Sequence, residues 1–200
     1  FKRKILNDLL AWKNSPFRKP LIIRGARQVG KTTVIKEFGK SFDTFYMLNL
    51  EIPAHHEYFS KNLSPHEILQ KISLDTGIRR NGNTLLFLDE IQQSSEAIAM
   101  LRYFFEDIPE LYVVAAGSLL EVMMDRKQIS FPVGRVEYLY LYPLNFHEYL
   151  EAVEEEEALK LLHTIPLPAW GEDKLASLFK AYTLIGGMPE AVNRYILKKE

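Results

Sequence analysis

The segment from Gly25 to Thr32 has the residue types and the spacing of a phosphate-binding loop. It fits the pattern G-x-x-x-x-G-K-[ST], directly after an apolar run and before a helical pattern. Glycines let successive backbone N–H groups turn toward one anion, and the following helix adds the positive end of its dipole. Lys31 would contact the β- and γ-phosphates, and the Thr32 hydroxyl would bind Mg²⁺. We therefore predict that ATP is held by Gly25, Ala26, Arg27, Gln28, Val29, Gly30, Lys31, Thr32 and, as a first-turn residue of the helix, Thr33.

A pair of carboxylates, Asp89-Glu90, ends the apolar run 84–88 and begins 58 residues after Lys31. A strand carries its last side chains to the carboxyl edge of a parallel sheet, where the ligands of open α/β sheets bind. We predict that Asp89 holds Mg²⁺, usually through water, and that Glu90 polarises the attacking water. A kinase does not need this second role, because its acceptor is a substrate hydroxyl. The pair therefore favours hydrolysis.

Two further positions are predicted to act on the γ-phosphate. The apolar run 111–116 would form an additional strand, inserted between the strands of runs 21–24 and 84–89. Ser118 follows this run and would sense the γ-phosphate from its tip; the alternative is that Ser118 caps the next helix. Charge that develops on the γ-phosphoryl oxygens needs a fixed cation, and Arg135 is the first candidate. Arg126 and Arg194 are alternatives. For each of these arginines, a solvated surface charge is the competing interpretation.

A metal site other than that for Mg²⁺ is not predicted. His55 and His56 are adjacent rather than four residues apart on a helix, and the chain has no cysteine to complete a structural set. Tyr138, Tyr140 and Tyr142 alternate along one apolar run, which is typical of residues that cover one face of a sheet.

The elements that position these groups are predicted from five runs rich in β-branched, aromatic and leucine residues. Segments long enough for helices separate these runs, and this alternation is typical of βαβ units. It predicts an α/β fold, a P-loop NTPase with a mostly parallel five-stranded sheet and helices on both faces. The runs are 21–24, 45–50, 84–89, 111–116 and 136–141.

The chain beyond Pro143 contains only helical patterns. Asn145 and Glu148 have the spacing of a capping box, as do Ser64 and Glu67 earlier in the chain. We predict an ATPase core over residues 1–143 and a small helical lid over 144–200. Since the last helical pattern has no glycine or proline stop, we also expect that a longer protein is truncated before a C-terminal domain.

Composition favours a folded cytoplasmic protein. The 200 residues are 47% hydrophobic, and 25 Lys+Arg against 26 Asp+Glu give a net charge of −1, which marks neither disorder nor a general nucleic-acid binder. The absence of cysteine favours a reducing compartment, and no apolar run has the length of a membrane span. The first forty residues hold eleven Lys/Arg, so this stretch is predicted to face an anion.

The motifs resemble those of AAA-like P-loop ATPases, prokaryotic ATP-binding proteins of the archaeal-ATPase and origin-recognition-like branch. The resemblance implies Mg²⁺-dependent ATP hydrolysis, coupled to an unknown conformational or nucleic-acid-related task. It also implies a homo-oligomer in which Arg135 serves its own or a neighbour's nucleotide, and a DNA or protein target reached through a further C-terminal domain. The matching segments, in order, are 24–33, 86–92, 116–118, 133–136, 144–150 and 186–192.

Other classes remain open from the residues alone. A nucleotide-binding switch or scaffold with little turnover would keep the loop, although intact Lys31, Thr32, Asp89 and Glu90 argue for turnover. A P-loop kinase would replace water by a substrate hydroxyl. A GTPase is not favoured, because the chain lacks an Asn-Lys-x-Asp segment. A DNA-directed motor is compatible with the basic first forty residues.

Overall fold

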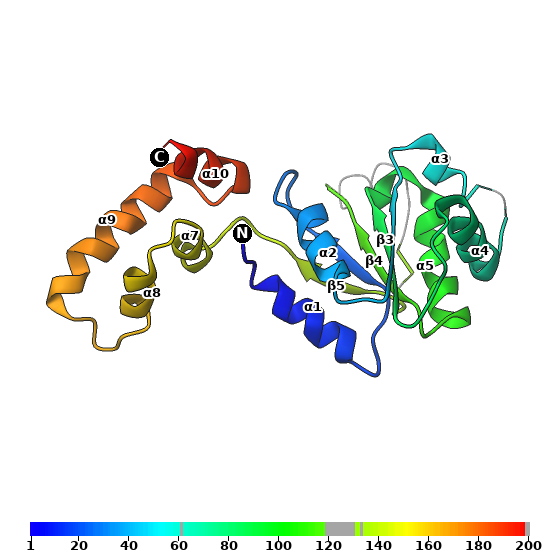
Figure 1. The fold of residues 1–200 in the computed structure, drawn as a ribbon, viewed down its shortest axis with the longest axis horizontal. Helices are drawn as coiled ribbons and strands as arrows, with labels where there is room; N and C mark the ends of the chain where they lie inside the picture. Colours follow the sequence, from blue (N-terminus) through cyan, green and yellow to red (C-terminus); the bar gives the residue numbers. More distant parts are fainter. Residues whose placement is uncertain (61, 119–130, 133, 199–200) are drawn as a thin grey trace. The chain divides into compact units, whose positions relative to one another are not determined.

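The computed structural model describes residues 1–60, 62–118, 131–132 and 134–198 (Figure 1). The chain divides into two compact units. The sheet unit comprises residues 6–27 and 31–141, and the helical unit comprises residues 1–5, 28–30 and 142–200. The middle of the phosphate-binding pattern, residues 28–30, thus belongs to the helical unit, together with the first five residues of the chain.

The sheet unit contains one parallel sheet, which confirms the predicted α/β fold. Among the described residues it has five strands in the order β2-β3-β4-β1-β5, and every recorded pairing is parallel. Strand β4 lies between β1 and β3, as predicted for an ATPase with an additional strand. The strands are β1 (Leu21–Arg24), β2 (Thr44–Asn49), β3 (Thr84–Asp89), β4 (Tyr112–Ala116) and β5 (Glu137–Tyr140).

Helices cover both faces of this sheet, also as predicted (Figure 1). Alternate strand residues, among them Ile22, Leu86 and Val113, form one buried cluster with apolar residues of α4 and α5. On the other face, Trp12 packs its ring against Phe38 of α2 and Tyr112 of β4. The helices of this unit are α1 (Ile5–Asn14), α2 (Lys31–Gly39), α3 (Pro53–His56), α4 (Pro65–Thr76), the short 3₁₀ helix η1 (Ile91–Gln93) and α5 (Ser95–Asp107).

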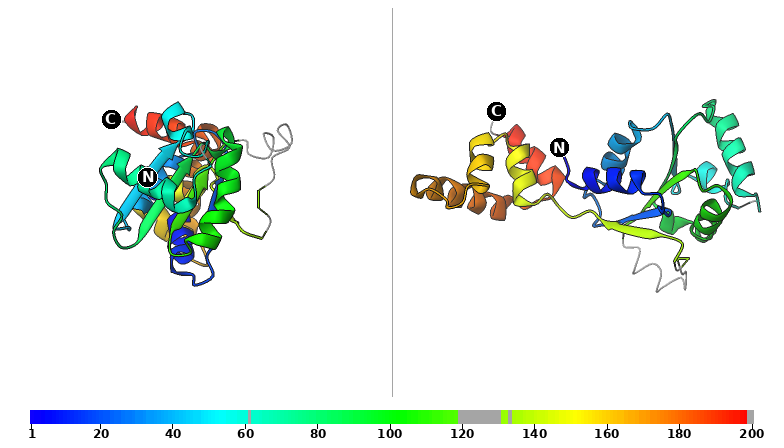
Figure 2. Two further views of the ribbon diagram at one scale, coloured as in Figure 1. Left: turned by 90° about the vertical axis from the view of Figure 1, so that its right-hand side faces the viewer. Right: turned by 90° about the horizontal axis from the view of Figure 1, so that it is seen from below.

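The helical unit has its own small core. Leu144, Tyr149, Leu150 and Val192 are almost fully buried there. The Asn145–Glu148 capping box predicted for the start of α7 is present, as is the Ser64–Glu67 box of α4. The described helices, which can be followed in Figure 2, are α7 (Phe146–Ala152), α8 (Glu156–Leu162), α9 (Ala169–Ile185) and α10 (Pro189–Leu197).

The Gly186-Gly187 pair, which connects α9 to α10, makes a close backbone contact with Leu144. Leu144 donates its backbone N–H to Gly187 O at 2.7 Å. A Cβ atom on Gly187 would lie 2.1 Å from Leu144 O, a distance that no side chain could occupy. The Tyr182 hydroxyl donates to the same Leu144 oxygen at 2.9 Å. Gly187 therefore lets the segment before α7 pass directly against the α9–α10 turn.

Among the described residues, no helix combines the length and apolar character that a membrane span requires.

Candidate functional site

The predicted phosphate-binding loop runs from the end of β1 into the first turn of α2. Gln28 (φ +64°) and Gly30 (φ +95°) adopt left-handed backbone conformations within it. Lys31 is buried, and its Nζ donates to Gly25 O and Ala26 O, both at 2.9 Å. The lysine side chain therefore folds back over the start of its own loop.

Burial lowers the pKa of Lys31 below its ordinary value of 10.5, while the negative charges of Glu90 and Asp89 oppose that shift. A cation held in a partly dry site interacts strongly with an anion that enters it, because the local dielectric constant is low. The position of Lys31 between its own loop and two carboxylates is suited to phosphate.

The two predicted Mg²⁺ ligands, Thr32 and Asp89, are in direct contact. The Thr32 hydroxyl donates to Asp89 Oδ2 at 2.7 Å, and Asp89 is only 5% exposed. Burial raises the pKa of Asp89 and the charge of Glu90 adds to this, whereas the hydrogen bond from Thr32 lowers it. A hydroxyl and a carboxylate that converge in this way are oxygen ligands of the kind that Mg²⁺ prefers, so the residues present fit the ion.

Glu90 is oriented by two polar neighbours. Its backbone has a left-handed φ of +53°, in the tight turn between β3 and η1. Gln92 Nε2 donates to Glu90 Oε2 at 2.5 Å, and the Ser118 hydroxyl donates to the same oxygen at 3.4 Å. The structure thus brings Ser118 next to Glu90, where β3 and β4 end side by side.

The structure does not bring Arg135 to this site. Arg135 precedes β5, which runs parallel to β1, so it lies at the amino edge of the sheet and not at the carboxyl edge with Asp89. Its Nε donates to Glu106 Oε1 at 2.9 Å. Arg194 is exposed and pairs with Glu190 within α10. Arg126 lies outside the described residues.

Two buried polar side chains that contact the site, Gln92 and Arg3, were not predicted from the sequence. Gln92 lies inside one of the segments that carry the family resemblance, but nothing in its type or spacing pointed to Glu90. Arg3 is 7% exposed and donates to Val29 O of the loop at 3.1 Å. The sequence placed Arg3 only within the basic stretch of the first forty residues. No local pattern indicates its partner Glu148, which lies 145 residues away.

His55 and His56 make local hydrogen bonds. His55 Nδ1 lies 3.0 Å from the backbone N of Asn49, and His56 Nε2 lies 3.2 Å from Gln93 O. In the part of the chain that the structure describes, no group of three or more His, Asp or Glu residues is arranged to hold a metal ion.

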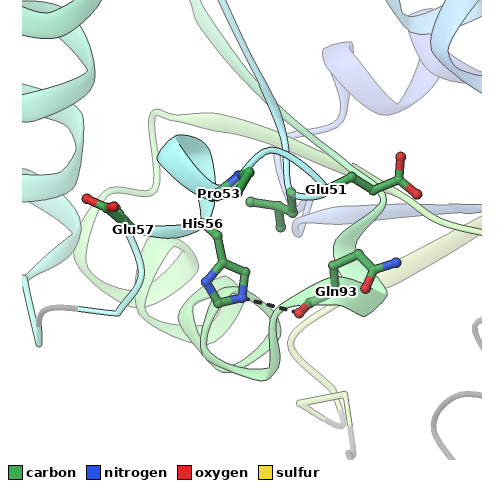
Figure 3. Close-up of a pocket in the computed structure, with 6 residues that line it drawn as sticks. Glu51, Pro53, His56, Glu57 and Gln93 are labelled. Atoms are coloured by element: carbon green, nitrogen blue, oxygen red, sulfur yellow. Dashed lines mark hydrogen bonds between the residues drawn. The ribbon is translucent and has the colours of Figure 1, made fainter.

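An open pocket of about 590 Å³ lies beside α3, near the end of β2 (Figure 3). Its lining includes the acidic residues Glu51 and Glu57 together with Pro53, His56 and Gln93. The lining residues carry two negative charges and no lysine or arginine, so this pocket is less suited to phosphate groups than the loop beside Lys31.

The chain has a phosphate-binding loop pattern between β1 and α2, and β4 is inserted between β1 and β3. These two features define its class: P-loop proteins with an additional strand. A family model described as an AAA domain matches residues 17–150. Because this match covers more than half of the 200 residues, the chain belongs to the AAA domain family, which confirms the predicted resemblance to AAA-like P-loop ATPases.

A solved structure shares the fold. The chain aligns with Drosophila ORC bound to DNA at a TM-score of 0.53 and 14% identity, over 96% of this chain and 57% of that one. It also aligns with the Aeropyrum pernix ORC2 protein in its ADPNP and ADP complexes at a TM-score of 0.39 and 18% identity, over 77% and 49% of the two chains. The chain therefore spans about half the length of these proteins. No curated protein matches the sequence.

Proposed function

We propose that this AAA-family chain binds ATP with Mg²⁺ and hydrolyses it to ADP and phosphate. The observation that carries the proposal is that Lys31, Thr32, Asp89 and Glu90 gather at the carboxyl edge of the sheet. The hydrogen bond between Thr32 and Asp89 joins the two elements that supply them.

In this proposal, the loop residues Gly25 to Thr32 surround the β- and γ-phosphates, and Lys31 leaves its two carbonyl partners to neutralise phosphate charge. Glu90 orients a water molecule in line with the γ-phosphorus and accepts its proton as the new P–O bond forms and the bond to ADP breaks. Ser118 reaches the same region through Glu90 Oε2 and would report whether the γ-phosphate is present.

Thr32 and Asp89 would hold Mg²⁺, directly or through water. When bound, the ion would draw charge from the β- and γ-phosphate oxygens, as in other P-loop proteins.

Arg135 would serve a neighbouring subunit. Its position at the amino edge, opposite the loop of its own chain, favours a nucleotide held by another copy over its own. A homo-oligomer is therefore part of this proposal. A DNA or protein target is a further expectation from the family resemblance, and a cytoplasmic location, which the cysteine-free sequence favours, is also part of the proposal.

The intact set of Lys31, Thr32, Asp89 and Glu90 favours turnover over a binding-only switch. A P-loop kinase remains the second candidate, and the test separates all three. ATP turnover should require Mg²⁺, release free phosphate without an added acceptor, and stop in Glu90→Gln while ATP affinity is kept. Tight binding with no phosphate release in the assembled full-length protein would favour the switch, and phosphate transfer that needs an added hydroxyl acceptor would favour the kinase.

A further inference from the structure

Arg3 is a buried cation close to the phosphate-binding loop. Its guanidinium group donates to three acceptors, all within the helical unit: Val29 O at 3.1 Å, Glu148 Oε1 at 3.2 Å and Tyr142 O at 2.5 Å. The side chain is about 6% exposed. Arg3 therefore has a fixed place, with partners in two other segments of the chain, residues 28–30 and residues 142–148.

The contact with Val29 O has a direct consequence for phosphate binding. In a planar trans peptide the carbonyl of one residue and the N–H of the next point in opposite directions. Arg3 draws the Val29 carbonyl toward itself, so the N–H of Gly30 must point the other way. Backbone N–H groups oriented in this manner are what an anion-binding loop uses.

The left-handed conformation of Gly30, with φ +95°, fits the same arrangement. A Cβ atom on Gly30 would lie 3.8 Å from Arg3 Nη1 and 3.9 Å from Pro189 Cγ, which are ordinary contact distances. There is room for a side chain at position 30, so the steric surroundings do not require glycine. The left-handed backbone angle does.

Glu148 holds Arg3 from the opposite side. This carboxylate is 5% exposed and accepts hydrogen bonds from Arg3 Nε, the Lys4 backbone N–H at 2.8 Å and, through Oε2, the Asn145 backbone N–H at 3.1 Å. The last of these closes the capping box of α7. The residue that begins this helix is therefore linked, through Arg3, to the loop carbonyl.

We propose that Arg3 is a positioning residue for phosphate binding: it fixes the orientation of the Val29–Gly30 peptide from outside the loop and ties it to the start of α7. This inference rests on the proposed function, since its consequence is higher affinity for a nucleotide. Arg3 itself does not touch the phosphates in this scheme.

Removing Arg3 alone would leave the buried Glu148 carboxylate without its cation, which is destabilising whatever the role of Arg3. The informative comparison is therefore Arg3→Gln combined with Glu148→Gln against Glu148→Gln alone. Glu148→Gln keeps an acceptor for the α7 cap and keeps Arg3 available to Val29 O. It also leaves the buried Arg3 cation without its carboxylate, a cost that the thermal midpoint reports. Arg18→Gln is the matched arginine control, because Arg18 donates to the backbone carbonyls of Pro109 and Glu110 in the sheet unit.

Two quantities are measured in each variant: the Kd for Mg²⁺-ATP by calorimetry, and the hydrogen exchange of the amides of residues 28–31 without nucleotide. We expect the double variant to bind ATP about tenfold more weakly than Glu148→Gln, the effect of one hydrogen bond from a charged donor, and to exchange these amides faster. Arg18→Gln should match the wild type in both.

The thermal midpoint of each variant separates positioning from general stability. If affinity follows the midpoint rather than the presence of Arg3, or if the double and single variants share the same Kd and exchange rates, the inference is overturned. If the wild type binds no ATP, the proposed function fails, and equal or unequal exchange of residues 28–31 still decides whether Arg3 positions the loop.

Discussion

Thr32 and Asp89 are joined by a hydrogen bond of 2.7 Å although they lie 57 positions apart in the chain. Thr32 belongs to the first turn of α2, and Asp89 is the last residue of β3. The bond exists only when the sheet has formed with β4 between β1 and β3, because that strand order sets where the loop lies relative to the end of β3. Correct assembly of the sheet therefore creates the candidate Mg²⁺ site.

The raised pKa of Asp89 predicts that its charge lowers the stability of the nucleotide-free protein. Burial favours the neutral carboxyl group, so the pKa of Asp89 is higher in the folded chain than its ordinary value of 3.8. The stability that this group contributes is therefore fully present below pH 3.8 and is lost as the pH rises through the pKa of the folded state. Asp89→Asn, which is neutral at every pH, should be more stable than the wild type near about pH 7, with the difference shrinking toward about pH 4. Urea unfolding at several pH values measures this, and a variant that is less stable than the wild type at neutral pH would contradict it.

Gln92 is predicted to position Glu90 for its proposed role. Its Nε2 atom donates to Glu90 Oε2, and the loss of a hydrogen bond to a charged group corresponds to about a tenfold or larger effect. Gln92→Ala should lower kcat by about that factor and leave the Kd for ATP unchanged. Gln93→Ala is the matched control, because Gln93 is its exposed neighbour in the same 3₁₀ turn. An equal kcat in both variants would show that Gln92 only fills space.

Arg135 provides the test of assembly. An arginine that acts on a neighbour's nucleotide contributes about 10³-fold or more to turnover, so Arg135→Ala should lose most of its kcat in the assembled full-length protein while ATP affinity is kept. Arg102→Ala is the control, since Arg102 pairs with the same Glu106 carboxylate from within α5.

Mixtures of Arg135→Ala and Glu90→Gln subunits then decide between sites shared by two subunits and sites within one. Shared sites regain partial activity, because some interfaces combine an intact Arg135 with an intact Glu90. Wild-type turnover in Arg135→Ala would instead assign this arginine to its ion pair with Glu106 alone.

Gly187 is predicted to be required for the helical unit. A methyl group there would meet Leu144 O at 2.1 Å, so the backbone must shift in Gly187→Ala, at a cost of about 1–3 kcal/mol. Gly186→Ala is the comparison. Gly186 has a φ of +78° and no atom within 4 Å of an added Cβ, so this variant measures the cost of the backbone angle alone, without a steric clash. Circular dichroism during denaturation measures both, and a Gly187→Ala protein as stable as the wild type would show that the close contact is dispensable.

Local patterns predicted the fold well because each signal acts over a few residues. Two of the five strands, Leu21–Arg24 and Thr84–Asp89, have the expected bounds, and the others are shifted or shortened by one or two residues. The edge strand Glu137–Tyr140 is the most shortened, with alternating exposure rather than full burial. Apolar runs mark buried strands clearly, whereas the ends of an edge strand depend on hydrogen bonds that no local pattern specifies.

The candidate site could be predicted where its chemistry lies within one short motif. The loop, Asp89 and Glu90 follow this rule, and strand polarity then brings them to one edge. Arg3 and Glu148 could not be paired in advance, because their ion pair joins the beginning of the chain to the first turn of α7. The edge of the sheet at which Arg135 lies could likewise not be predicted. It depends on the direction of β5 relative to β1, which no local pattern specifies.

Mg²⁺-ATP binding by Lys31→Ala, compared with the wild type and Lys36→Ala, tests whether residues 25–32 hold the nucleotide. Lys31 is buried, donates to two loop carbonyls and is influenced by the charges of Asp89 and Glu90, while Lys36 is an exposed lysine on the same helix. Calorimetry should show wild-type affinity in Lys36→Ala and loss of binding by about a hundredfold or more in Lys31→Ala, as expected for a charged contact with phosphate in a partly dry site. Equal affinity of Lys31→Ala and the wild type would contradict the assignment of residues 25–32 as the nucleotide-binding loop.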